Sequence, residues 1–334
     1  MINGKQCTIL WHVDDLKISH VNPSVTSNII NKLEMEFRNE APLTIRRGKT
    51  HDYLGMILDF TQPGKVIIDM RNYVEEILSE VPSDMSGEAP TPAAQHLFNV
   101  NEDPDRLTED VAQMFHHIVA KSLFLSKRGR PDLQTAIAFL STRVKTPDND
   151  DYKKLARMIK YMRSTKELVL TLSADPTQIV QWWIDGSYAV HPDMRGHTGA
   201  AMSMGAGVMY GSSTKQKLNT RSSTEAELVA VDDVLPQVLW TRLFLQEQGY
   251  AVSENVIHQD NQSAILLEKN GRASSGKRTK HINIRYFYVA DKVANKEVSI
   301  AYCPTAEMIG DFFTKPLQGA LFRRLRDFIL NIAK

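Results

Sequence analysis

The stretch IVQWWIDG, residues 179–186, decides the fold of the C-terminal half of this chain. Its alternation places Asp185 on the same face of a strand as Trp183, with Trp182 on the opposite face. Because both faces are largely apolar, the stretch is expected to be a central strand covered on both sides. An Asp-Gly pair taken alone favours a turn instead. The surrounding pattern of strand, helix, strand and helix predicts an α/β domain with a mixed sheet and Asp185 at a strand end.

Three further carboxylates lie near the ends of predicted elements in the same half. Glu227 lies in the helical segment SSTEAELVAVDDVL, Asp260 ends the strand-like run NVIHQD, and Asp311 lies in the helix-like segment AEMIGDFF. Taken singly, Asp260 is equally well explained as a helix cap, and a residue such as Asp311 is more often a solvated surface charge. Together with Asp185 they can converge only in a folded α/β domain. Four converging carboxylates repel one another, so the set indicates a site for hard divalent cations and phosphodiester hydrolysis with two metal ions.

The helical segment holds two glutamates with different predicted roles. Ser222 followed three residues later by Glu225 fits a capping box, which gives Glu225 a structural role on the polar side of the helix. Glu227 shares an inward stripe with Val231 and Val234. A carboxylate on an apolar stripe is costly to bury unless a cation meets it. Glu227 is therefore the predicted metal ligand.

The bulk composition limits the classes of protein to consider. The 334 residues suggest two or three domains, and no apolar run approaches the roughly 20 residues of a membrane span. The net charge is only +1, so any phosphate-binding surface must be a local patch. Two distant cysteines are expected to be reduced, as in an intracellular protein. Residues 82–106, rich in Pro, Ser, Gly and Asp, are the predicted linker.

Two patterns outside the carboxylate set carry possible functions. Residues 6–13 and 16–19 are predicted to form a β-hairpin with Asp14 and Asp15 at its tip, where an ordinary turn is the simpler explanation. A basic cluster between the third and fourth carboxylates is either a solvated face or a set of phosphate contacts. Its members are Lys277, Arg278, Lys280, His281 and Arg285.

Several motifs together resemble a known family. IDGSYAVHPDMRGHTGAAMSMGAG, KQKLNTRSSTEAELVAV, QDNQSAI, KRTKHINIRYFYV and CPTAEMIGDFFTKPL closely resemble the ribonuclease H domain of copia-type LTR retrotransposon Pol polyproteins. The resemblance continues N-terminally through WHVDDLKISH, DYLGMILDF, FHHIVAKSLFLSKRGRPD and LARMIKYMRST. It implies a ribonuclease H-like mixed five-stranded sheet with flanking helices, preceded by an incomplete reverse-transcriptase palm/thumb and a helical connection. The implied division is 1–90 for the palm/thumb remnant, 91–175 for the connection and 176–334 for the ribonuclease H domain.

The resemblance also implies an activity. A ribonuclease H cleaves the RNA strand of RNA–DNA hybrids with two Mg²⁺ or Mn²⁺ ions, held here by Asp185, Glu227, Asp260 and Asp311. Many members carry a histidine in the loop before the last helix, where this chain has Cys303-Pro304-Thr305. The implied setting is intracellular, in a cytoplasmic particle or the nucleus, without a membrane and with upstream polyprotein segments (integrase and polymerase fingers) as partners.

The hairpin resembles the polymerase motif Tyr-x-Asp-Asp, with His12 in the tyrosine position. The implied role of Asp14 and Asp15 is to hold Mg²⁺ against the incoming nucleotide. That site also needs an earlier aspartate and the fingers, so we expect no DNA synthesis from this chain alone. The alternative function is a non-catalytic or scaffold fragment of a decayed retrotransposon polymerase that binds nucleic acid.

Overall fold

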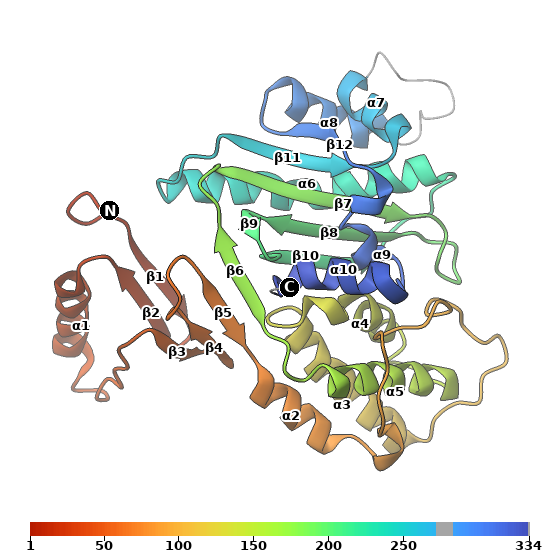
Figure 1. Cartoon of the computed structure of the whole chain (residues 1–334), viewed down its shortest axis with the longest axis horizontal. Helices are drawn as coiled ribbons and strands as arrows, with labels where there is room; N and C mark the ends of the chain where they lie inside the picture. Colours follow the sequence, from red (N-terminus) through yellow and green to blue (C-terminus); the bar gives the residue numbers. More distant parts are fainter. Residues whose placement is uncertain (272–282, 333–334) are drawn as a thin grey trace.

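The computed structural model of the chain describes residues 1–271 and 283–332. Its C-terminal half is organised around a five-stranded sheet (Figure 1). The strand order is β10 (Tyr210–Lys215), β8 (His197–Ser203), β7 (Ile179–Ser187), β11 (Glu254–Gln259) and β12 (Ser299–Tyr302). Strand β8 pairs antiparallel with both β10 and β7, whereas β11 pairs parallel with both β7 and β12. The predicted mixed sheet is confirmed, and the strands that present Asp185 and Asp260 are neighbours.

Both faces of this sheet are covered. On one face, Trp182 and its alternate neighbours in β7 join a core with Val231 and Val234 of α6 (Ser223–Glu247). On the other face, Trp183 joins a second core with apolar residues of α9 (Asp311–Thr314) and α10 (Gly319–Leu330). The indole Nε1 of Trp182 donates to Oδ1 of Asn255 at 3.1 Å, which satisfies its buried N–H. The predicted alternation of β7 is therefore observed. Helices α7 (Gln262–Asn270) and α8 (Asn283–Ala294) pack on each other beside α6.

A second, fully antiparallel sheet connects distant parts of the chain. Its order is β3 (Thr50–Tyr53), β4 (Met56–Asp59), β5 (Val66–Asp69), β6 (Leu170–Ala174) and β9 (Gly205–Ala206). The pairing of β4 with β5 follows the predicted strands on either side of the Gln-Pro-Gly turn. The sheet contains strands from all three segments expected from sequence, so hydrogen bonds cross both expected boundaries.

Helices fill the space beneath the main sheet (Figure 1). They are α2 (Arg71–Glu80), α3 (Glu109–Ser126), α4 (Gln134–Ser141) and α5 (Asn149–Ser164). Residues 82–106 were expected to be a linker, and that expectation is wrong. Met85, Leu97 and Phe98 of this segment are buried in the same core as Phe139 of α4. Apart from a 3₁₀ turn at Ser83–Met85, the segment forms no helix or strand, yet its apolar side chains anchor it to the helices.

The N-terminal hairpin forms its own two-stranded sheet. Strand β1 (Cys7–His12) pairs with β2 (Asp15–His20), followed by α1 (Pro23–Phe37). The register pairs His12 with Asp15, so the turn itself is Val13 and Asp14. Large apolar side chains are exposed here: Trp11 is 77% exposed and Val13 is 78% exposed. No helix within the described ranges is long and apolar enough to cross a bilayer.

Candidate metal centre

Three carboxylates meet where β7 and β11 approach the start of α6. Asp185 lies near the end of β7, Asp260 directly follows β11, and Glu227 lies in the second turn of α6. One carboxylate oxygen from each lies within 4.8 Å of the others. Asp185 and Glu227 are buried, whereas Asp260 is half-buried and marks the open side of the group. The parallel pairing of β7 and β11 causes this convergence, because the carboxyl ends of the two strands meet at one sheet edge.

The fourth predicted ligand, Asp311, adjoins this group through a lysine. Asp311 begins α9, and the ammonium of Lys315 lies 2.6 Å from its Oδ1 and 3.6 Å from Oδ1 of Asp185. The expected single helix-like segment is broken, because a 3₁₀ turn at Thr305–Glu307 is separated from α9. The break lies at Met308, whose backbone is extended. Gly310 follows with helical angles, and a Cβ at this position would lie 2.9 Å from Cβ of Asp185. The close approach of the two segments therefore requires glycine.

Gly186 has a similar role on the other side of Asp185. It lies within β7, so the turn suggested by the Asp-Gly pair is absent. A Cβ at Gly186 would lie 2.4 Å from the carbonyl oxygen of Ala226. This contact lets α6 approach the strand so closely that the Gly186 N–H donates to Oε2 of Glu227 at 2.9 Å. The glycine thus positions the predicted metal ligand Glu227 through a backbone hydrogen bond.

Hydrogen-bonding side chains that the sequence did not identify surround the carboxylates. Gln259 donates from Nε2 to Oε2 of Glu227 at 3.3 Å. Thr305 donates to Oδ2 of Asp260 at 2.9 Å, and Thr314 donates to Oδ2 of Asp185. The spacing of Lys315 four residues after Asp311 was a readable signal, since such pairs face each other on a helix. The two threonines and Gln259 gave no such signal, because only the fold brings them to their partners.

Burial and mutual repulsion control the charge of the group. Burial, followed by the charges of Asp185 and Asp260, raises the pKa of Glu227 well above its ordinary range, although two hydrogen-bond donors oppose this. Burial and the charge of Asp185 likewise raise the pKa of Asp311 to about 7, with Lys315 opposing. Full ionisation of the metal-free carboxylate group is therefore disfavoured. A divalent cation bound among these oxygens would offset the repulsion between them.

The two glutamates of α6 differ in their partners. Ser222 is the N-cap, and its hydroxyl accepts the N–H of Glu225 at 3.3 Å, as predicted. The Glu225 carboxylate accepts the N–H of Arg221 at 2.7 Å, so it contributes to the start of the helix. The expectation that Glu225 lies on the polar side is wrong, since it is as buried as Glu227. The carboxylates differ in their contacts, because Glu227 alone of the two belongs to the acidic group.

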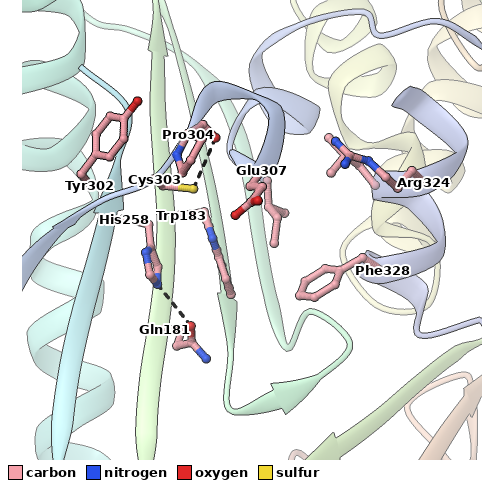
Figure 2. Close-up of a pocket in the computed structure, with 11 residues that line it drawn as sticks. Gln181, Trp183, His258, Tyr302, Cys303, Pro304, Glu307, Arg324 and Phe328 are labelled. Carbon is pink, nitrogen blue, oxygen red and sulfur yellow. Dashed lines mark hydrogen bonds between the residues drawn. The ribbon is translucent and has the colours of Figure 1, made fainter. Parts of the chain in front are cut away.

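An open hollow of about 430 Å³ lies on the α10 side of the sheet (Figure 2). Its wall includes Trp183 and His258, whose rings stack with centroids 5.1 Å apart and planes 16° apart. Trp183 lies two positions before Asp185 on the same face of β7, and His258 lies two positions before Asp260, which follows β11. Gln181 also lines the hollow, and its Oε1 accepts a hydrogen bond from Nε2 of His258 at 3.2 Å. The stacked rings therefore support the strand ends that present the carboxylates.

The remaining predicted site residues lie elsewhere. Asp14 and Asp15 are exposed at the tip of the β1–β2 hairpin, which Figure 1 shows well away from β7 and α9. Arg285 in α8 forms ion pairs with Asp232 and, at 3.7 Å, with Asp233 of α6. Lys277, Arg278, Lys280 and His281 lie outside the described residues. The structure thus brings four of the predicted acidic residues together and leaves the hairpin pair apart from them.

Comparison with curated proteins gives a consistent set of relatives. The Pol polyprotein of transposon TNT 1-94 from Nicotiana tabacum is 25% identical over 328 residues, covering 96% of this chain and 24% of the relative. The Pol polyprotein of transposon RE1 from Arabidopsis thaliana is 26% identical, covering 94% and 21% respectively. The Ty1-MR1 Gag-Pol polyprotein of Saccharomyces cerevisiae is 23% identical, covering 97% and 19%. The chain therefore spans about a fifth to a quarter of the length of these relatives.

No protein-family model matches the chain. Among solved structures, a ribonuclease H1 isolated from compost covers 41% of this chain and 93% of its own, with 11% identity and a TM-score of 0.32. Ribonuclease H1 from Halobacterium salinarum covers 46% and 99%, with 14% identity and a TM-score of 0.26. These scores are too low to assign the fold, which rests on the strand order described above. Over 94–97% of its length, the chain is a homologue of the Pol polyproteins of copia-type retrotransposons.

Proposed function

We propose that this chain is a metal-dependent endonuclease of the ribonuclease H type that cleaves the RNA strand of RNA–DNA hybrids. The observation that carries the proposal is the group formed by Asp185, Glu227 and Asp260, whose ligand oxygens lie within 4.8 Å of one another. Asp311 extends the group through Lys315. The relatives are Pol polyproteins, which supports a reaction on nucleic acid.

The residues fit Mg²⁺ or Mn²⁺ as the cofactor. Every side chain of the group offers oxygen, the donor that these hard cations prefer. Burial of Asp185, Glu227 and Asp311 makes their combined charge costly, and two ions would offset it. When bound, such ions supply Lewis acidity toward the scissile phosphate, toward an attacking water and toward the departing 3′ oxygen.

The chain's own residues orient the ligands for this chemistry. The Gly186 N–H and the Gln259 amide both donate to Oε2 of Glu227, which restricts the rotation of the carboxylate. Thr314 and Thr305 donate to one oxygen each of Asp185 and Asp260. Because each of these three ligands has a fixed hydrogen-bond donor, little rearrangement is needed when a cation binds.

The substrate proposal extends to the basic cluster and to the rest of the chain. We propose that Lys277, Arg278, Lys280 and His281 contact phosphates of the hybrid, which would be distinguished by backbone shape and 2′-hydroxyl groups. Arg285, the fifth residue of the cluster, instead pairs with Asp232 and Asp233. In the same proposal, residues 1–90 are a reverse-transcriptase palm/thumb remnant, 91–175 the connection and 176–334 the nuclease. Asp14 and Asp15 would hold Mg²⁺ only with upstream polymerase segments of the polyprotein, including the fingers, as partners.

A labelled RNA–DNA hybrid tests the activity directly. The purified chain should cut the RNA strand with Mg²⁺ or Mn²⁺ and stop when EDTA is added. Asp185→Asn should lose this cleavage and retain the folded circular dichroism spectrum. A wild-type chain that binds Mn²⁺ and hybrid without cutting would contradict the proposal.

A scaffold role is the second candidate function. The exposed apolar side chains of the hairpin, including Trp11 at 77% exposed, favour a contact with another protein segment. In that case the chain would bind hybrid, and its hydrodynamic size would increase with the upstream polymerase segment, but it would show no metal-dependent cleavage. Sedimentation of the chain with that segment, together with the cleavage assay, separates the two functions.

A further inference from the structure

Gln259 connects two of the predicted metal ligands through one side chain. It is the last residue of β11 and is fully buried. Its Nε2 donates to Oε2 of Glu227 at 3.3 Å. Its Oε1 accepts the backbone N–H groups of Asp260 at 2.8 Å and Asn261 at 3.0 Å. A single amide therefore joins α6 to the point where β11 ends and α7 begins.

The orientation of this amide is determined by its partners. Two backbone N–H groups can only donate, so the side-chain oxygen must face them and the NH₂ group must face Glu227. Reversing the amide would place donors against donors at a site without solvent. The Glu227 carboxylate thus receives a donor from Gln259 and another from Gly186 on the same oxygen, Oε2. Its rotation is restricted from two sides.

We propose that Gln259 is a positioning residue that holds Glu227 and Asp260 at the spacing a divalent cation requires, an inference that rests on the proposed function. Without the amide, Glu227 would keep only the Gly186 donor and could rotate about its last side-chain bond. The backbone at Asp260 and Asn261 would lose the acceptor that fixes the end of β11. Both ligands would then have to be ordered when the cation binds, which weakens binding.

Gln259→Met tests this, because methionine has a similar length and cannot replace the amide hydrogen bonds. Mn²⁺ affinity is measured by calorimetry on the full chain, together with the Mn²⁺ dependence of hybrid cleavage. We expect affinity to fall about ten- to a hundredfold, as for residues that hold metal ligands. Gln181→Met is the matched control, since Gln181 lies on the adjacent strand and bonds to His258, outside the acidic group. It should leave Mn²⁺ affinity unchanged.

Gln259→Asn isolates the contact with Glu227 if the methionine variant fails to fold. An asparagine side chain readily accepts an N–H two residues ahead, so the N–H of Asn261 keeps a partner, while the shorter amide does not reach Glu227. Affinity should fall in the same direction. In a Glu227→Gln background, the effect of Gln259→Asn on Mn²⁺ affinity should be lost. Amide hydrogen exchange at Asp260 and Asn261 in the metal-free Gln259→Met variant should accelerate.

The outcomes separate this inference from the proposed function. A lower melting temperature with unchanged Mn²⁺ affinity in both Gln259 variants would overturn the positioning role, whatever the cleavage assay shows. Wild-type chain that binds Mn²⁺ without cutting hybrid would overturn the proposed function alone. Weaker Mn²⁺ binding in both variants would then still support the role of Gln259.

Discussion

The ammonium of Lys315 lies 2.6 Å from Oδ1 of Asp311, one helical turn earlier, and 3.6 Å from Oδ1 of Asp185. Burial opposes the charge of this lysine, but attraction by Asp185 and Asp311 outweighs it and raises the pKa of Lys315 to about 12. The ammonium is therefore charged at neutral pH. In the metal-free protein it offsets part of the repulsion within the carboxylate group.

Replacing Lys315 should make the thermal stability of the protein depend more strongly on bound Mg²⁺. Lys315→Met removes the compensating charge, so the melting temperature of the metal-free protein should fall and the increase caused by Mg²⁺ should grow. Thermal melts with EDTA and with Mg²⁺ measure both. Lys292→Met is the control, because Lys292 pairs with Glu297 at 3.0 Å, outside the acidic group. A smaller Mg²⁺-induced increase in Lys315→Met would show that the lysine assists cation binding instead.

Replacing each of the two buried glutamates of α6 by glutamine should have different effects on cleavage. Glu227→Gln should reduce cleavage at least about a hundredfold, the upper range for residues that only support a ligand. It should also raise the melting temperature of the metal-free protein, because burial and two neighbouring carboxylates disfavour its charge. Glu225→Gln should retain cleavage and lose about 1 kcal/mol or less of stability, the size of a cap effect. Cleavage lost in Glu225→Gln and retained in Glu227→Gln would contradict the assignment.

Local patterns were sufficient to predict the central features of the sheet and the site. The alternation in β7 placed Trp182 and Trp183 on opposite faces, and the structure shows them in separate cores. Ser222 was predicted as the cap of α6, and it is. Asp185 and Asp260 were each predicted to end a strand-like run, and the structure places them at the ends of the neighbouring strands β7 and β11. Each of these predictions rests on a pattern that spans only a few consecutive residues.

Features that depend on contacts between distant segments were not predictable. Gly186 was assigned to a turn, but it is required by the approach of Ala226. Residues 82–106 resemble a linker in composition, although Phe98 is buried against Phe139 with ring centroids 5.7 Å apart. The role of Gln259 depends on Glu227, which lies 32 positions away in sequence. Composition and periodicity carry no information about such pairs.

Two buried histidines should make stability depend on pH. Nε2 of His191 lies 2.9 Å from Nδ1 of His197, whose Nε2 lies 2.8 Å from Oγ of Ser213. Burial lowers the pKa of His191 from 6.5 to about 4 and that of His197 to about 3. Below about pH 6.5 these histidines therefore bind more protons in the unfolded chain than in the folded protein. Their contribution to the free energy of unfolding is greatest above that pH and decreases as the pH falls.

The slope of the free energy of unfolding against pH can reach about 1.4 kcal/mol per pH unit for each histidine. Urea unfolding between pH 7 and pH 5 measures it. His197→Gln should flatten the dependence, whereas substitution of the exposed His116 by Gln should leave it unchanged. Equal slopes for the wild type and His197→Gln would show that this pair does not control the acid sensitivity.

The two cysteines should react at different rates. Cys303 is buried beside the carboxylate group, and burial together with the charges of Glu307, Asp260 and Asp311 raises its pKa to about 11. Only the thiolate reacts readily, so about one in a thousand Cys303 side chains is reactive at pH 8. Half-buried Cys7 should be alkylated by iodoacetamide first, as measured by mass spectrometry of peptides. Faster modification of Cys303 would contradict its burial.

The basic cluster predicts a change in salt dependence. If Lys277, Arg278 and Lys280 contact phosphates, replacing all three by Ala should weaken hybrid binding. Each lost contact should reduce the slope of log affinity against log salt by roughly 0.7–0.9, about 2–3 in total. Cleavage at saturating hybrid should persist, because these residues position the duplex and take no part in bond breaking. Fluorescence anisotropy at several salt concentrations gives the slope.

Arg285 provides the contrast within the same cluster. Its guanidinium pairs with Asp232 and Asp233, so it ties α8 to α6 in the free protein. Arg285→Ala should therefore lower the melting temperature more than the triple variant does, and change the salt slope by less than one contact. His281→Ala should lower turnover if this histidine acts on substrate, or the melting temperature if it only packs. An unchanged slope in the triple variant would mean that residues 277–280 are a solvated surface, and a reduced slope in Arg285→Ala would place this arginine on the substrate instead.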